Sequence, residues 1–96
     1  MLKYRIIYGK DYLKDLKNIV KSGDKKIVNK VEQIIEKLKK DPHKKRSGVD
    51  IKLISSRKDA VYRVRIGKYR MVYEIDESEK KIFITMIFPR GSGRGY

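Results

Sequence analysis

The sequence predicts an α+β domain in which a helical hairpin packs against a mostly antiparallel sheet. Two patterns point to this class. Between residues 11 and 40, apolar residues recur with a period of about 3.6, which is typical of amphipathic helices. After residue 48, short alternating runs rich in Val, Ile and Tyr indicate strands. The chain has 96 residues, so we expect a single domain over 1–96 with the element order β-α-α-β-β-β-β.

The first strand is expected at residues 3–8, KYRIIY, and two helices follow it. Asp11 and Asp24 are the candidate N-caps of these helices. Asp41-Pro42 ends the second helix, because the residue before proline disfavours the α conformation. About two residues join the helices, so they should form a hairpin. The apolar stripes are Tyr12, Leu13, Leu16, Ile19 and Val20 in the first helix, and Ile27, Val28, Val31, Ile34, Ile35 and Leu38 in the second.

Four further strands are expected after a polar loop. They are VDIKLI at 49–54, AVYRVRI at 60–66, YRMVYEID at 69–76 and KIFITMIF at 81–88. The last of these is apolar on both faces, which predicts a strand inside the sheet rather than at its edge. Pro89 ends it, and a glycine-rich tail, RGSGRGY, follows.

Net charge is the strongest signal in the composition. The chain has 26 Lys and Arg against 12 Asp and Glu, which gives +14. A domain this basic attracts polyanions, with nucleic acid as the first candidate, an acidic protein as the second and an anionic membrane as the third. A lysine-rich surface that serves solubility or heat tolerance is the alternative. The sequence has no Cys and no long apolar run, so we expect a cytoplasmic protein without a membrane span.

The stretch YRVRIGKYR places like charges opposite each other. A two-residue turn at Gly67-Lys68 sets the register of a β-hairpin, so that Arg65 pairs with Arg70. Arg63 lies on the same face, while the alternate residues are apolar and should face the helices. Like charges directly opposite on a sheet are destabilising by up to about 1 kcal/mol. Folding stability therefore does not explain why three arginines share this face, and a functional role is indicated.

Arginine's planar fork suits phosphate, so the hairpin indicates an anion site. The alternative is that Asp50, Glu74 or Asp59 offsets the charge, or that the arginines extend into water. Arg90 follows the last strand and Tyr96 ends the chain, where an aromatic ring near cations could stack on a base. A frayed tail is the alternative there. His43, the only histidine, is expected to be solvated rather than catalytic, and we expect no metal site and no cofactor.

The run YRVRIGKYRMVYEID, followed by KIFITMIFPRGSGRGY, resembles the RelE/ParE superfamily of toxins from prokaryotic toxin–antitoxin modules, and within it the RelE branch. The resemblance covers nearly the whole chain. It implies a RelE-like fold and a ribosome-dependent endoribonuclease that cuts messenger RNA in the A site without a metal. It also implies an acidic, RelB-like antitoxin that wraps the toxin in a higher-order hetero-oligomer.

The resemblance also assigns roles to single residues. Arg63 and Arg65 fall at basic active-site positions, and Arg70 falls on the hairpin arginine of the family. Arg90 matches the arginine after the last strand, and Tyr96 matches the tyrosine that stacks on a message base. The implied reaction is attack of a ribose 2′-hydroxyl on the adjacent phosphate. The further RNA-binding residues expected are Lys52, Lys68 and Arg94.

This sequence departs from the family at the position of the general base. Arginine, with a pKa above about 12, is a poor proton acceptor where a lysine could serve. The base must then come from Lys52, Lys68, Tyr96 or the ribosome. Two other functions stay open: a ParE-type toxin that poisons DNA gyrase without nuclease activity, and a plain basic nucleic-acid-binding domain.

Overall fold

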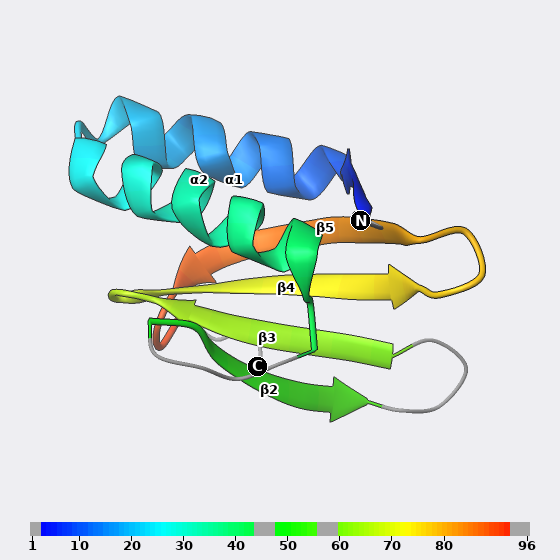
Figure 1. The fold of residues 1–96 in the computed structure, drawn as a ribbon. Helices are drawn as coiled ribbons and strands as arrows, with labels where there is room; N and C mark the ends of the chain where they lie inside the picture. The colour runs from blue at the N-terminus through cyan, green and yellow to red at the C-terminus, as the bar shows by residue number, and fades with distance from the viewer. Residues whose placement is uncertain (1–2, 44–47, 56–59, 93–96) are drawn as a thin grey trace.

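The computed structural model describes residues 3–43, 48–55 and 60–92. Both helices lie on one face of a five-stranded sheet with the strand order β1-β5-β4-β3-β2 (Figure 1). β1 is parallel to β5, and the other neighbouring strands are antiparallel. The α+β class and the element order predicted from the sequence are confirmed. The elements are β1 (Arg5–Tyr8), α1 (Lys10–Lys21), α2 (Lys25–Lys40), β2 (Asp50–Ser55), β3 (Ala60–Ile66), β4 (Tyr69–Asp76) and β5 (Lys81–Pro89).

One of the two predicted helix caps is confirmed and one is wrong. At α2, the Asp24 carboxylate accepts a hydrogen bond from the backbone N–H of Ile27 at 3.2 Å, as an N-cap should. At α1, the N-cap is Gly9 rather than Asp11. The Gly9 N–H donates to the carbonyl of Ile84 on β5 at 2.8 Å, so a tertiary contact decides where the helix starts. Asp11 lies in the first turn, where its charge still suits the helix dipole.

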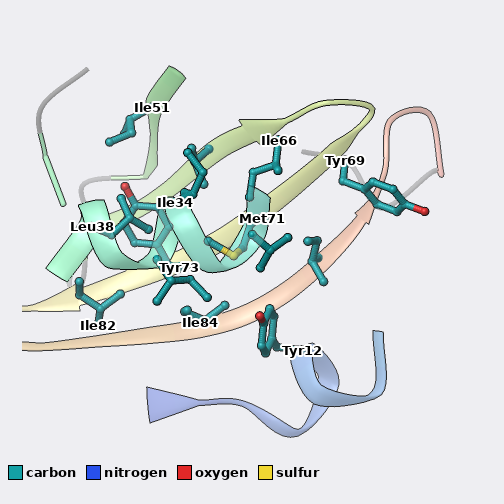
Figure 2. Close-up of a cluster of buried hydrophobic side chains, with 14 of the residues drawn as sticks. Tyr12, Ile34, Leu38, Ile51, Ile66, Tyr69, Met71, Tyr73, Ile82 and Ile84 are labelled. Atoms are coloured by element: carbon teal, nitrogen blue, oxygen red, sulfur yellow. The ribbon is translucent and has the colours of Figure 1, made fainter. Parts of the chain in front are cut away.

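The core fills the space between the helices and the sheet face beneath them (Figure 2). Burying each large apolar side chain is worth about 1.5–3 kcal/mol. In α1 the stripe is only partly covered, because Tyr12 and Ile19 are buried while Leu13 and Val20 stay about half exposed. The buried side chains include Ile27, Val31, Ile34, Ile35 and Leu38 from α2, and Val64, Ile66, Met71, Tyr73, Ile82 and Ile84 from the sheet.

The β3–β4 hairpin has the register that its turn predicts. Its pairs include Ile66 with Tyr69 and Arg65 with Arg70. Gly67 in the turn has φ +59°, a left-handed conformation that favours glycine. A Cβ at this position would also lie 2.9 Å from Cδ1 of Ile27, so the turn passes close beneath α2. Turn geometry and helix packing therefore fix the hairpin together.

At the other end of the sheet, a polar cluster joins the chain after α2 to the β4–β5 turn. Both ring nitrogens of the exposed His43 are engaged, Nδ1 by the Tyr62 hydroxyl at 3.0 Å and Nε2 by Glu77. Glu77 also accepts hydrogen bonds from the Tyr4 hydroxyl at 2.7 Å and from Lys80 at 3.1 Å. The Tyr4 hydrogen bond does most to lower the pKa of Glu77 to about 2. His43 is thus part of a structural network as well as solvent-exposed.

The close approach of the hairpin turn to α2 can be tested by Gly67→Ala, with Gly23→Ala as the matched control. Both glycines have positive φ, but a Cβ at Gly23 would meet nothing within 4 Å. Gly23→Ala should lower the free energy of unfolding by about 1 kcal/mol for backbone strain alone. Gly67→Ala should lower it slightly further, because the methyl group also has to displace Cδ1 of Ile27, at the end of a flexible side chain. Equal losses in chemical denaturation would show that the turn does not press on α2.

Glu77→Gln tests the polar cluster through its pH dependence. The pKa of Glu77 is lowered, so its contribution is fully present above its ordinary value of 4.5 and is lost as the pH falls toward about 2. At neutral pH the variant should be less stable by up to about 1 kcal/mol, a small value because Glu77 is half exposed. In urea titrations the difference should shrink as the pH falls below 4.5 and vanish only as the pH falls past about 2. Glu79→Gln, in the same turn, is the control, and an equal pH profile for both variants would contradict the assignment.

Candidate functional site

Three arginines gather on the face of the sheet opposite α1 and α2, which we call the distal face. Arg65 on β3 pairs directly with Arg70 on β4, and Arg63 lies two residues before Arg65. Side chains alternate along a strand, and Val64 between the two β3 arginines is fully buried in the core under the helices. Arg63 and Arg65 therefore point to the distal face. We call Arg63, Arg65 and Arg70 the arginine cluster.

The neighbouring strands complete two rows across the distal face. In the first row, Asp50 on β2 lies opposite Arg65, and Phe88 on β5 lies opposite Arg70. The cluster is thus flanked by one carboxylate and by an aromatic ring that is 3% exposed. The second row, read from β2 to β5, consists of Lys52, Arg63, Val72 and Met86. The predicted RNA-binding residue Lys52 therefore lies beside the cluster.

Arg63 is the unusual member of the cluster because it is buried. Its residue exposure is 6%, and its Nη1 atom has no hydrogen-bond partner among the described residues. Burial does most to lower the pKa of Arg63, and the charges of Arg65 and Arg70 lower it further, against the opposing effect of Asp50. A buried guanidinium nitrogen without a hydrogen-bond partner is costly, since a buried polar group normally has a partner. An anion at this place would supply one.

The sequence left open whether carboxylates offset the cluster. Asp50 does so in part, since its Oδ2 lies 3.7 Å from Nε of Arg65 and its charge also acts on Arg63. The side chains of Asp50 and Arg65 are both about half exposed. Glu74 pairs with Val61, in the row beyond Arg63. Asp59 lies outside the described residues. An exposed ion pair at this distance contributes at most about 1 kcal/mol, so Asp50 compensates the cluster only in part. Nη1 of Arg63 still lacks a hydrogen-bond partner among the described residues.

The end of β5 brings Arg90 to the hairpin. Its backbone N–H donates to the carbonyl of Lys68 in the β3–β4 turn at 2.8 Å, and Pro89 pairs with Tyr69. The Lys68 ammonium in turn lies 5.8 Å from the centre of the Tyr69 ring. This hydrogen bond joins two residues far apart in sequence at the end of the sheet that carries the cluster. There the end of β5 lies beside the β3–β4 turn (Figure 1). The predicted site residues Arg94 and Tyr96 lie outside the described part of the chain.

Sequence reasoning missed a second set of polar residues on α2, two of which are lysines. Lys30, Gln33 and Lys37 line a groove between α2 and the hairpin, and Arg65 lines the same groove. The signal was available, because positions 30, 33 and 37 recur at helical spacing on one face of the helix. The same spacing is also typical of ordinary solvated helix lysines, which is why it did not stand out.

Metal-binding and membrane-spanning features are both absent from the part of the chain that the structure describes. Within residues 3–43, 48–55 and 60–92, no group of three or more His, Cys, Asp or Glu side chains could hold a metal ion. Neither helix in those ranges has the length and apolar character that crossing a membrane requires.

The arrangement of the cluster can hold a phosphate and stabilise charge that develops on it. Guanidinium groups bind phosphate oxygens through paired N–H donors, and they do so more strongly where water is excluded, as at Arg63. They are always protonated, so the cluster itself cannot take a proton from an attacking hydroxyl. A proton acceptor must come from outside the three arginines.

Comparison with known families gives a match over most of the chain. The family described as the ParE toxin of the type II toxin–antitoxin system, parDE, matches residues 3–92. A protein of Methanocaldococcus jannaschii that is named as a toxin, RelE1, is 38% identical over 89 residues, which cover 93% of this chain and 92% of that protein.

Solved structures match as well. A chain in the archaeal RelE–RelB complex from Pyrococcus horikoshii OT3 has a TM-score of 0.79 at 24% identity, covering 95% of this chain and 99% of that one. A chain in the RelB–RelE antitoxin–toxin complex from Methanococcus jannaschii has a TM-score of 0.70 at 26% identity, covering 94% and 96%. These likenesses confirm the RelE-like fold expected from the hairpin motif.

Arg63→Met tests whether the buried guanidinium lowers the stability of the folded protein. Replacing a buried charge whose Nη1 has no hydrogen-bond partner by an apolar side chain of similar length should raise the free energy of unfolding by about 1 kcal/mol or more. In a domain of this size, that corresponds to a melting temperature about 4–8 °C higher. Arg65→Met is the control, since Arg65 is half exposed and should give a smaller gain. A loss of stability in Arg63→Met would mean that the guanidinium is satisfied within the folded chain.

Proposed function

Since the chain belongs to the RelE/ParE superfamily and is a toxin of the type II toxin–antitoxin class, we propose that it is a ribosome-dependent endoribonuclease that cleaves messenger RNA in the A site. The observation that carries this proposal is the arginine cluster with its buried, unpaired Nη1 on Arg63. Like charges held in register are unfavourable for folding alone, and an RNA phosphate between the strands would make them favourable.

The proposed reaction is attack of a ribose 2′-hydroxyl oxygen on the adjacent phosphorus. A new P–O bond forms as the bond to the 5′-oxygen of the next nucleotide breaks. The 2′-hydroxyl proton passes to a base, and the 5′-oxygen takes up a proton, which leaves a 2′,3′-cyclic phosphate and a 5′-hydroxyl. Arg63, Arg65 and Arg70 bind the phosphate and the charge that develops on its oxygens, and Arg90 stabilises the leaving oxygen. These steps use no metal ion.

We assign the proton acceptor to Lys52. It lies opposite Arg63 on the distal face, and its neutral amine could accept a proton where a guanidinium could not. Lys68 is less well placed, because it lies in the turn beyond the paired strands. Tyr96 would stack on a message base and so align the 2′-hydroxyl, with Lys68 and Arg94 contacting the RNA backbone. The roles of Arg94 and Tyr96 rest on the family resemblance.

The proposed partner is an acidic, RelB-like antitoxin that wraps the toxin and holds it inactive in a hetero-oligomer. Two similar structures are toxin–antitoxin complexes, and a net charge of +14 favours an acidic partner. Such a partner would be partly disordered alone and would fold on binding. A toxin that acts on ribosomes works in the cytoplasm.

One observation favours a second candidate function. The family match is to a ParE toxin, and the ParE branch is associated with poisoning of DNA gyrase rather than with RNA cleavage. In that case the basic face would contact a protein. A basic domain that only binds nucleic acid is the third possibility, and it predicts binding without toxicity.

The test is to map message cleavage on translating ribosomes with the purified wild type and single variants. The wild type should cut message in the A site and cut free RNA poorly. Arg65→Ala, Arg70→Ala and Arg90→Ala should each lower the cleavage rate by about 100-fold or more, because each removes a donor to developing charge. Lys52→Arg keeps the charge but cannot accept a proton, so it should lose as much activity as Lys52→Met.

Arg5→Ala is the matched control, since Arg5 is exposed on β1 at the opposite edge of the sheet. It should cleave like the wild type. Toxicity with intact message and gyrase-dependent DNA breaks would select the second function. Full activity in Arg65→Ala and Arg90→Ala would overturn the site, and a normal rate in Lys52→Arg would remove only the assignment of the base.

A further inference from the structure

The groove between α2 and the hairpin is a basic surface, and the proposed reaction uses Arg65 from its lining but none of the residues of α2. Its lining from α2 is Lys30, Gln33, Ile34 and Lys37, and its lining from the sheet side is Gly48, Arg65, Ile66 and Gly67. Three of these side chains are cationic, and no described lining residue is a carboxylate. A concave surface of one sign concentrates counter-charged ligands.

Arg65 makes the groove continuous with the arginine cluster. The residue belongs to both, and its side chain is 52% exposed. At this end β2 begins at Asp50, directly opposite Arg65, so β2 does not flank the residues of β3 beyond that pair. A chain bound at the cluster could therefore pass round this edge toward α2.

The backbone beside the groove passes close to α2 at two glycines. Gly67, at the hairpin turn, and Gly48, before β2, have no side chains and positive φ values. The ammonium of Lys37 lies 3.5 Å from the position a Cβ at Gly48 would take, so this lysine extends across from the helix toward the sheet edge. Lys30 and Lys37 lie seven residues apart, about 10 Å along the helix. That length exceeds the rise along the duplex axis for each phosphate of one strand, about 3.4 Å, so the two lysines can contact different phosphates.

The lining favours a nucleic-acid backbone over a protein. Among its described lining residues, the large apolar ones are Ile34 and Ile66, which are 6% and 2% exposed and already belong to the core. An amphipathic protein helix needs an exposed apolar groove in which to bury its anchors, and this one offers little. A phosphate backbone needs cations and amide donors, which Lys30, Gln33 and Lys37 supply.

We propose that this groove binds the sugar–phosphate backbone of single-stranded RNA next to the phosphate held by the arginine cluster. The inference rests on the proposed function in taking RNA as the polyanion. The lysines of α2 would fix the direction and register of the strand, and the arginines would act on one phosphate within it.

The experiment compares Lys30→Gln/Lys37→Gln with Lys14→Gln/Lys17→Gln. Both double variants remove two exposed helix charges, but the second pair lies on α1, away from the groove. The probe is a single-stranded RNA 12-mer with 2′-O-methyl riboses, which cannot be cut by 2′-hydroxyl attack, and binding is followed by fluorescence anisotropy from low to high salt. The groove variant should bind about 10-fold more weakly, and its salt slope should fall by about 1.4, or 0.7 for each phosphate that a lysine no longer neutralises. The α1 variant should bind less than about 3-fold more weakly.

Three outcomes overturn the proposal. The first is a groove variant that equals the α1 variant in RNA affinity and salt slope. The second applies if the groove variant melts at a much lower temperature than the wild type, so that its weak binding reflects unfolding. In that case a Lys30→Arg/Lys37→Arg variant, which keeps both charges, decides: if it is folded but binds RNA more weakly than the wild type, the proposal is overturned. The third is unchanged RNA affinity with weaker binding of an acidic antitoxin peptide, which would assign the groove to a protein partner.

The groove and the proposed function can fail separately. A wild type that cuts no message, yet binds the RNA probe in a way that depends on Lys30 and Lys37, contradicts the proposed function and supports the groove site. A wild type that cuts message, with a groove variant equal to the α1 variant, supports the proposed function and removes the groove site.

Discussion

The register of the β3–β4 hairpin is the constraint on which the rest of the structure depends. Because side chains alternate along a strand, one register sends Val64 and Met71 into the core and Arg65 and Arg70 to the distal face. Burial of the apolar set is worth several kcal/mol, whereas the paired arginines cost about 1 kcal/mol or less. Packing against α2 therefore holds like charges together, and the fold itself supplies the site.

Arg63 is unfavourable for folding but well suited to binding an anion. Its guanidinium is buried beside two other cations, and its Nη1 has no partner in the described part of the chain. Natural domains tolerate such strain mainly at functional positions, where a ligand completes the hydrogen bonds. The exposed Arg65, which has Asp50 close by, carries less of this cost. The cluster thus combines one desolvated cation, Arg63, with an exposed cation, Arg65, whose charge is partly screened by water and by Asp50.

The two ends of the sheet serve different purposes. One end carries the hairpin turn, Arg90 and the groove along α2, whereas the other carries the Tyr4, His43 and Glu77 network (Figure 1). That network ties the chain after α2 to the β4–β5 turn, and the capped start of α2 lies toward the hairpin. α2 is therefore anchored at both ends, which gives its lysines a fixed position relative to Arg65.

The sequence by itself determined the element order, the α2 cap, the hairpin register and the gathering of three arginines on one face, because each follows from local turn chemistry and side-chain periodicity. Only the tertiary structure decided the rest. The contact of Gly9 with β5 moved the start of α1 ahead of Asp11, and the pairing of β5 with β4 brought Arg90 to Lys68. The burial of Arg63 and the groove along α2 likewise depend on which surfaces meet. Contacts between residues far apart in the chain leave no periodic signal in one sequence, so the burial of Arg63 could not be derived from it. For the groove, the sequence shows the helical spacing of the α2 lysines but not the hairpin surface that they face.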